Sequence, residues 1–307
     1  MGLPLRLLSG VPIDSELVLS TVPLASSVEG YEPLLQLRLG RVQARPSTPW
    51  QRRENGIELA EAPQGHLIHV EDEATFLIDH EGRCVLCEIV PDTPMGVIEQ
   101  LFIDQIWPIV LRIRGRFSLH ASAVTRQSGV IAFLADTGFG KSTLASSLAA
   151  AGRGQLFSDD CLAVTFDEDR AMAEPSYDSA RLWPESAGAL FGDRGELARA
   201  SPITQKRRVA LPWSEGPRPL LRLYLLERAD EPPTIRYLGR AEAFGRVLLH
   251  LNRFGLPERG RLVEEADFLE RLVTAVPVAR LAYRRDFSEL PLVHATVSAD
   301  EGRGPRG

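Results

Sequence analysis

The stretch GVIAFLADTGFGKSTLASSLAAAG, residues Gly129 to Gly152, decides the fold of this chain. Its first six residues form an unbroken apolar run, which is typical of a buried strand. The glycine-containing loop Ala135–Gly140 follows the run. Lys141 to Ala151 then has the apolar spacing of a helix, and Gly152 is a suitable residue to end it. The order strand, loop, helix predicts an α/β fold with the loop at the carboxyl end of a buried strand.

The loop and the start of the helix, ADTGFGKS at residues 135–142, match the phosphate-binding pattern GxxxxGK[ST] at every position but the first. Ala135 ends the strand, where a small side chain is sufficient. Gly138 and Gly140 allow the backbone to curl so that its N–H groups point at phosphate oxygens. Lys141 reaches the β- and γ-phosphates, and the Ser142 hydroxyl can ligate Mg²⁺. The positive end of the helix adds to this attraction.

The loop therefore predicts a site for ATP with Mg²⁺. A chance match in a glycine-rich loop is the alternative, and the flanking strand and helix argue against it. The predicted nucleotide-binding residues are Asp136, Thr137, Gly138, Phe139, Gly140, Lys141, Ser142 and Thr143.

An acidic pair, Asp159 and Asp160, follows the short apolar segment Leu156–Ser158. The distance from the loop fits a helix, a tight reversal and a short strand. We therefore expect the pair at the carboxyl end of a strand that neighbours the loop strand, the edge where α/β sheets bind ligands. A simple turn is the alternative, because aspartates are common at strand ends. Two carboxylates allow one to hold Mg²⁺ while the other accepts a proton from an attacking hydroxyl.

A histidine, His120, lies in FSLHASAV, the strand-like segment before the loop strand. Alone, a histidine in an apolar strand is more often a core residue than a catalyst. Its position before the loop and the acidic pair makes it a candidate for the site.

These segments, FSLHASAV (117–124), the loop stretch and QLFSDDCLAV (155–164), resemble in order and spacing the HPr kinase/phosphorylase superfamily. The catalytic domain of that family shares its core with phosphoenolpyruvate carboxykinases. Weaker similarity, which extends to kinases from peptide natural-product clusters, lies in ARLWPESAGAL (180–190), KRRVALP (206–212) and LLRLYLLE (220–227). The resemblance implies that His120 lies beside the transferred phosphate and that Asp159 is the general base. It also implies that Asp160 assists the metal or orients the histidine.

The chain departs from the HPr kinases at one signature, Ile-Glu-Ile-Arg-Gly-x-Gly, whose glutamate helps to hold Mg²⁺. The nearest stretch here is Ala180 to Glu185, in which Glu185 can take that place in a different register. The departure speaks against HPr itself as the substrate and against the phosphorylase reaction. The basic run that ends at Arg208 falls where the family brings a basic residue to the phosphates, and Arg208 is therefore a catalytic candidate. A solvated basic turn is an equal alternative.

The bulk composition excludes several function classes. The 307 residues are 44% hydrophobic and 25% charged, with a formal net charge of −6. Basic and acidic residues are interspersed, so the sequence lacks the extended patch of basic residues that is expected of a nucleic-acid-binding protein. No apolar run reaches the ~18 residues of a membrane span, and the start lacks a secretory leader. We expect a cytoplasmic protein. Cys84 and Cys87 have CxxC spacing in a strand-like run without a second ligand pair, so we interpret them as apolar filling residues.

Two domains are expected from the length. Residues 1–95 are predicted to be a small, mostly β amino-terminal module, with strands to about residue 40 and over 66–90 and exposed loops over 45–65. A helix is expected to begin near Thr93 as its cap and Pro94 as its first residue, and to be interrupted at Pro108. Residues 96–297 are predicted to be the catalytic domain and 298–307 a disordered tail.

The predicted function is a Mg²⁺- and ATP-dependent kinase that transfers the γ-phosphate to a hydroxyl, in the first place a serine of a peptide or small protein. A nucleotide hydrolase, an ATP-binding regulatory or scaffold protein, and a kinase of a small metabolite are the alternatives. The resemblance also allows a homo-oligomer, because members of this family often assemble. No nucleic acid or membrane partner is expected.

Overall fold

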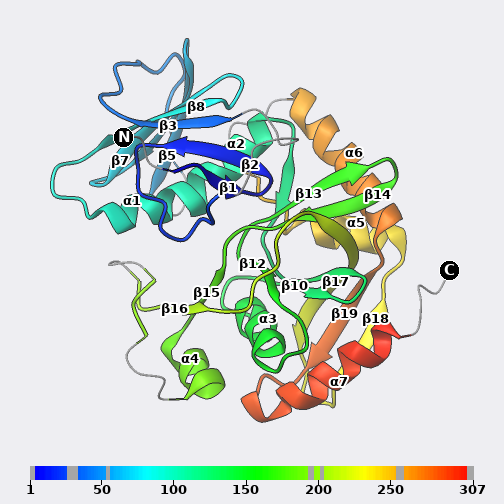
Figure 1. Cartoon of the computed structure of the whole chain (residues 1–307). Helices are drawn as coiled ribbons and strands as arrows, with labels where there is room; N and C mark the ends of the chain where they lie inside the picture. Colours follow the sequence, from blue (N-terminus) through cyan, green and yellow to red (C-terminus); the bar gives the residue numbers. More distant parts are fainter. Residues whose placement is uncertain are drawn as a thin grey trace.

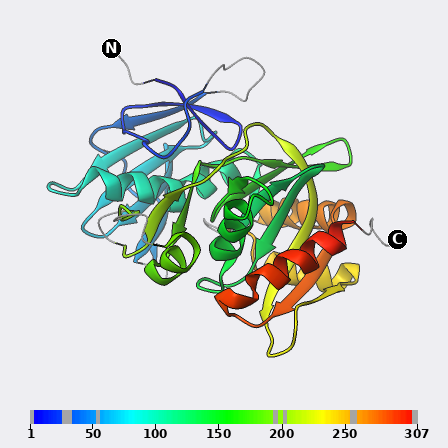
Figure 2. The same cartoon turned by 60° about the horizontal axis from the view of Figure 1, so that its bottom comes forward.

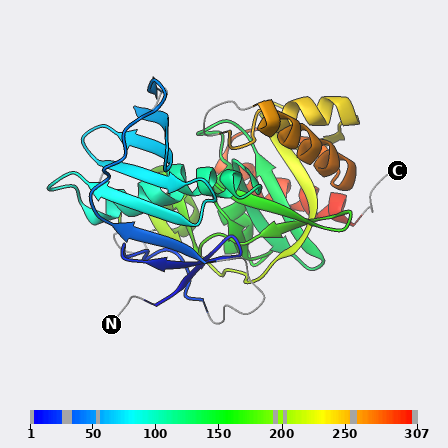
Figure 3. The same ribbon diagram turned by 90° about the horizontal axis from the view of Figure 1, so that it is seen from above.

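The chain is a mixed α/β protein built on two large sheets (Figure 1). The computed structural model describes residues 4–25, 34–52, 56–192, 197–200, 204–253 and 259–302. The first sheet uses strands from the first 89 residues, and the second uses strands from residue 117 onward. Figure 3 shows the two sheets side by side, with the first in blue to cyan.

In the described part of the chain, the amino-terminal sheet has eight strands. Their order across the sheet is β1 (Arg6–Leu8), β2 (Val11–Ser15), β3 (Leu35–Leu39), β8 (Cys84–Ile89), β7 (Ala74–Asp79), β6 (Gly65–Val70), β5 (Ile57–Ala62) and β4 (Gln51–Arg52). The strands predicted over 66–90 are confirmed. The prediction of loops throughout 45–65 is wrong at β5, where Ile57 and Leu59 are buried and pair with β6. Their alternation is strand-like, although the flanking segments are rich in Pro, Arg and Glu.

A helical segment connects the two sheets. It consists of α1 (Met95–Leu101), the π-helix η1 (Phe102–Ile106) and α2 (Trp107–Ile113). The predicted interruption takes the form of η1, and Pro108 lies in the first turn of α2, where its missing N–H is tolerated. Thr93 does not cap α1, because its hydroxyl donates to the carbonyl oxygen of Glu73, and Pro94 is the N-cap and not the first helical residue.

The connecting segment packs on the first sheet. Its apolar side chains, among them Ile98, Phe102 and Trp107, are buried in one core with β2, β3, β7 and β8. Cys161, Ala163 and Tyr177 from the second half of the chain belong to the same core. The two sheets therefore share buried contacts across the connecting segment.

The second sheet has nine strands among the residues that the structure describes. Seven follow one path, β12 (Leu156–Ser158), β10 (Ala121–Arg126), β11 (Gly129–Leu134), β17 (Arg218–Arg228), β14 (Arg170–Glu174), β13 (Leu162–Asp167) and β9 (Phe117–Leu119). The remaining two are β19 (Val278–Tyr283), which pairs with β17, and β18 (Thr234–Tyr237), which pairs with β19. A separate two-stranded sheet consists of β15 (Ser179–Leu182) and β16 (Arg207–Ala210).

The strand that precedes the loop, β11, is central and buried on both faces. Val130, Ala132 and Leu134 face the core that contains α5 (Arg240–Leu248) and α6 (Arg259–Ala275). Ile131 and Phe133 face the core that contains α3 (Lys141–Ala150) and α7 (Leu290–Glu301). Figure 2 shows α3 and α7 in front of the sheet. The helix α4 (Pro184–Phe191) packs against α3, and the short 3₁₀ helix η2 (Phe287–Glu289) precedes α7.

Two further expectations are corrected. The strand before the acidic pair, β12, does not neighbour β11, because β10 lies between them and is antiparallel to both. The carboxyl ends of β11 and β12 nevertheless reach the same edge. The predicted disordered tail begins inside α7, where the Tyr224 and Tyr237 hydroxyls donate to Asp300 and Arg126 donates to Glu301. Residues 303–307 lie outside the described part of the chain.

Candidate functional site

The loop between β11 and α3 has the conformation that its glycines allow. Gly138 and Gly140 have φ values of +81° and +95°, which favour glycine strongly. Gly140 is the N-cap of α3, and no side chain in the described part of the protein caps this helix. The N–H groups of the first turn and the positive end of the helix dipole are therefore available to an anion.

Lys141 is held inside the loop. Its side chain is buried, and Nζ donates to the carbonyl oxygens of Ala135 at 2.8 Å and Asp136 at 3.3 Å. Burial lowers the pKa of Lys141, whereas the charges of Asp160 and Asp159 raise it in part. These contacts hold the ammonium group against the backbone at the start of the loop.

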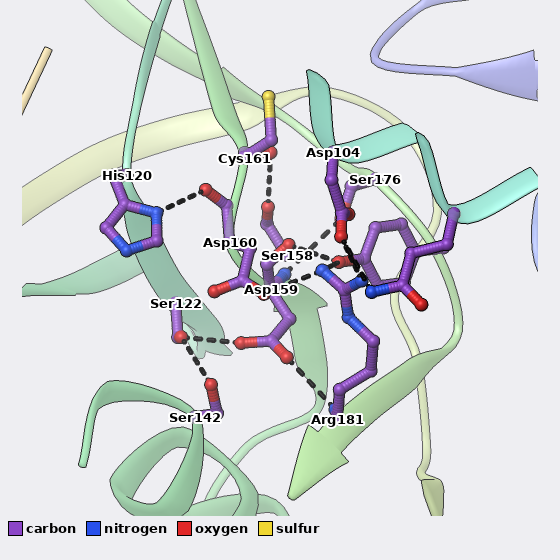
Figure 4. A network of polar contacts seen from close by, with 12 residues as sticks. Asp104, His120, Ser122, Ser142, Ser158, Asp159, Asp160, Cys161, Ser176 and Arg181 are labelled. Atoms are coloured by element: carbon purple, nitrogen blue, oxygen red, sulfur yellow. Dashed lines mark hydrogen bonds and ion pairs between the residues drawn. The ribbon is translucent and has the colours of Figure 1, made fainter. Parts of the chain in front are cut away.

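The two aspartates of the acidic pair have different surroundings (Figure 4). Asp159 is fully buried. Its Oδ1 accepts from the Ser122 hydroxyl at 2.6 Å, and its Oδ2 accepts from the backbone N–H of Arg181 at 3.1 Å. Burial, and next the charge of Asp160, raise the pKa of Asp159, although the hydrogen bond from Ser122 acts against them. Asp159 thus has both carboxylate oxygens bound within the protein.

Asp160 faces outward from the same turn. Its φ of +63° is unusual for a residue other than glycine, and aspartate tolerates it better than most. Its side chain is 21% exposed, and Oδ2 forms an ion pair of 2.7 Å with Nη2 of Arg181. Burial alone raises the pKa of Asp160, but the positive charges of Arg181, Lys206, His120 and Lys141 outweigh it and lower the pKa to about 2. Asp160 is therefore ionised at neutral pH.

His120 lies between β9 and β10, next to the acidic pair. Its Nδ1 is 3.2 Å from the carbonyl oxygen of Asp160. A carbonyl oxygen can only accept, so Nδ1 carries the proton and Nε2 of the neutral ring is left as an acceptor. Burial and the charge of Lys141 lower the pKa of His120. The neutral ring is consequently the main form at pH 7.

A pocket of about 70 Å³ brings several of these groups together, and we call it the central pocket. Besides loop and helix residues, its lining includes His120, Asp160 and the four basic residues Lys141, Arg181, Lys206 and Arg285. The excess of positive charge suits an anion with several charges.

Most of the sequence-predicted site residues meet at the central pocket. Those that line it are His120, Thr137, Gly138, Gly140, Lys141, Ser142, Thr143 and Asp160. Asp136 and Phe139 belong to the loop without lining the pocket, and Asp159 lies buried behind Asp160.

Two predicted residues lie elsewhere. Arg208, on β16, donates from Nη2 to the carbonyl oxygen of Ala200 at 2.9 Å, and Lys206 from the same basic run lines the central pocket in its place. Glu185, in the first turn of α4, lines an adjacent pocket of about 300 Å³, which we call the side pocket.

Sequence reasoning missed Arg181 and Ser122. The guanidinium of Arg181 bonds to Asp160 and, through Nη1, to Asp104 at 2.5 Å. Arg181 lies in a segment of weak similarity, but no spacing rule indicated its role. Ser122 lies two residues after His120, and the period of two along a strand was the available signal.

The donor set fits Mg²⁺ held together with phosphates. Among the described residues, no group of three or more His, Cys, Asp or Glu side chains forms a metal cage. Mg²⁺ commonly takes only one or two protein ligands beside phosphate oxygens and water. Ser142 and the partly exposed, ionised Asp160 line the same pocket and can provide them.

Comparison with known proteins finds similarity among solved structures but none at the level of sequence. No protein-family model and no curated protein matches the sequence. Among solved structures, the HPr(Ser) kinase/phosphatase from Coxiella burnetii is similar over 61% of this chain and 97% of that chain, with 12% identity and a TM-score of 0.35. None of the helices in the described ranges is long and apolar enough to cross a bilayer.

Proposed function

We propose that this protein is an ATP- and Mg²⁺-dependent kinase that transfers the γ-phosphate to a hydroxyl group. The observation that carries the proposal is the convergence of His120, Lys141, Ser142 and Asp160 on one pocket at the uncapped start of α3. When bound, Mg²⁺-ATP supplies the phosphoryl group and neutralises part of its charge.

The loop and the basic side chains bind the phosphates. Backbone N–H groups at the start of α3 and the ammonium group of Lys141 provide donors in fixed positions. Lys206 and Arg285 extend the positive lining of the pocket. Because phosphoryl transfer depends mainly on positioning and electrostatics, such a preformed cradle is the main requirement.

Asp160 and Ser142 are assigned to Mg²⁺. A carboxylate with a pKa of about 2 remains ionised at neutral pH, which suits a metal ligand and makes a weak base. Asp159, the general base predicted from the sequence, has no exposed surface and acts as a positioning residue through Ser122 and Arg181.

We assign to His120 the role of general base, which accepts the proton of the attacking hydroxyl. Its neutral ring keeps Nε2 as an acceptor, and the bond from Nδ1 to the Asp160 carbonyl fixes the ring. The hydroxyl of the acceptor loses its proton to Nε2 as its oxygen bonds to the γ-phosphorus. The bond from that phosphorus to the bridging oxygen of the nucleotide breaks, and ADP leaves with the electron pair. Because the three segments around His120, the loop and the acidic pair resemble the HPr kinase/phosphorylase superfamily, we propose a serine of a peptide or small protein as the acceptor.

The test uses ATP labelled at the γ-position, Mg²⁺ and serine-containing candidate acceptors, including the products of neighbouring genes. Transfer of label to an acceptor is the expected result, and release of inorganic phosphate alone contradicts the kinase proposal in favour of a hydrolase. Lys141→Ala and Asp160→Asn should each reduce transfer by on the order of 10²- to 10³-fold. Asp169→Asn, at the turn between β13 and β14, is the matched control and should leave transfer unchanged.

A further inference from the structure

The side pocket continues directly from the central pocket. The two pockets share five lining residues, Gly140, Thr143, Trp183, Ser186 and Arg285. Tyr283, Phe287 and Leu290 give the side pocket an apolar wall. Its volume of about 300 Å³ lies at the lower end of the range that small-molecule sites occupy.

The residues that line each pocket predict the orientation of a bound triphosphate. His120 and Asp160 line the central pocket but not the side pocket. Thr143 follows Ser142 on α3 and lines both pockets. We therefore expect the γ-phosphate of a bound triphosphate to lie near Asp160 and its β-phosphate to lie at the start of α3. The rest of the molecule would then pass Thr143 and enter the side pocket.

We infer that the side pocket binds the nucleoside of the triphosphate, with its base stacked on Trp183. This inference rests on the proposed function. Trp183 has 50% of its surface exposed and borders both pockets, so its indole is accessible to a ligand. An aromatic base can stack on an indole irrespective of the hydrogen-bond donors and acceptors that the base carries.

The polar residues of the side pocket fit a nucleoside. Glu185 and Asp286 provide carboxylate oxygens that accept hydrogen bonds from ribose hydroxyls or from an amino group on the base. This gives Glu185 a role in nucleoside binding in place of the metal-ligand role predicted from the sequence. Arg285 lines both pockets and donates from Nη2 to the carbonyl oxygen of Gly138 at 2.8 Å, which ties the side pocket to the loop.

The experiment compares ATP with inorganic tripolyphosphate, which has the phosphate chain without the nucleoside. Dissociation constants are measured by calorimetry with Mg²⁺ for the wild type, Trp183→Ala and Trp183→Phe. The control is Trp50→Ala, because Trp50 is also exposed, at 39%, but lies beside β4 of the first sheet. Trp183→Ala should weaken ATP binding roughly 5- to 100-fold, as loss of one base-stacking contact does. It should change tripolyphosphate binding less than about 2-fold, and Trp183→Phe should retain most of the ATP affinity.

Three results overturn the inference. The first is equal affinity of the wild type for ATP and tripolyphosphate, because the nucleoside then adds nothing to binding. The second is an equal loss of affinity for both ligands in Trp183→Ala, because Trp183 then contacts the phosphates. Unchanged ATP binding in Trp183→Ala places the base elsewhere. In each of these cases the proposed function stands, whereas failure of the wild type to bind either ligand overturns both.

Discussion

At the scale of single residues, two neighbouring aspartates with the same side chain have different surroundings in the candidate site. The carboxylate of Asp159 is buried and accepts two hydrogen bonds. The carboxylate of Asp160 is partly exposed and forms an ion pair with Arg181. The sequence could predict that the pair belongs to the site, because it follows a short strand. It could not predict which carboxylate faces the pocket, since that depends on the positive φ of Asp160 and on an arginine from another strand.

The assignment of His120 predicts the pH dependence of the reaction. If neutral His120 accepts the proton as we propose, turnover is lost when the ring becomes protonated. Burial and Lys141 lower the pKa of His120 from 6.5, and kcat should therefore stay constant from pH 8 to about 6.5 and fall only at lower pH. His120→Gln should lower kcat by roughly 10²- to 10⁴-fold and remove this acidic limb.

Measurement of kcat against pH with saturating ATP checks this prediction. Asp160 does not contribute in this range, because its pKa of about 2 keeps it ionised. Asp159 has a raised pKa and is the other candidate, so Asp159→Asn serves as the control and should keep the acidic limb. An acidic limb that survives in His120→Gln and disappears in Asp159→Asn would transfer the role of the base to Asp159.

At the scale of elements, the π-helix η1 links the connecting segment to the site. Asp104 of η1 is paired with Arg181, whose other guanidinium nitrogen holds Asp160. The sequence predicted an interrupted helix from Pro108 but not its π form, because that form depends on what the helix packs against. The sequence likewise placed the acidic pair at the correct edge while missing that β10 separates β12 from β11.

The link predicts that Asp104 is a positioning residue. In Asp104→Asn, Arg181 loses a charged partner in a mostly buried place, so the free energy of unfolding should fall by about 1–3 kcal/mol. The kcat should fall several-fold because Asp160 is held less firmly, whereas the dissociation constant for ATP should change little. Glu81→Gln, which removes an exposed ion pair with Arg83, should change neither quantity.

Denaturant unfolding, steady-state kinetics and calorimetric ATP binding together test this prediction. Asp104→Glu keeps the charge and should recover part of kcat. A loss of stability with kcat unchanged would show that Asp104 serves the fold alone.

At the scale of the whole molecule, the two sheets support one site. Tyr177 is buried in the core of the first sheet, and its hydroxyl donates to the carbonyl oxygen of Asp159 at 2.6 Å. The backbone N–H of Ser9 donates to Pro175, and the Trp107 indole donates to the Ser9 hydroxyl. Sequence patterns predicted the strands over 66–90 and the loop between β11 and α3, but contacts between distant segments have no local pattern. The predicted division at residues 95 and 96 stays a prediction.

These contacts predict that the protein unfolds as one cooperative unit. Separation of the halves would expose Ile98, Phe102 and Trp107 together with the part of the core that contains Tyr177, which costs free energy in proportion to the apolar area exposed. Differential scanning calorimetry should therefore show one transition. ATP with Mg²⁺ at 100 times its dissociation constant should stabilise the native state by about 2.7 kcal/mol and move that whole transition upward by several degrees. Lys141→Ala should unfold in one transition as well but lose the shift with ATP. Two transitions, of which ATP moves only one, would mean that the amino-terminal sheet unfolds independently and that the Tyr177 contact does not couple it to the acidic pair.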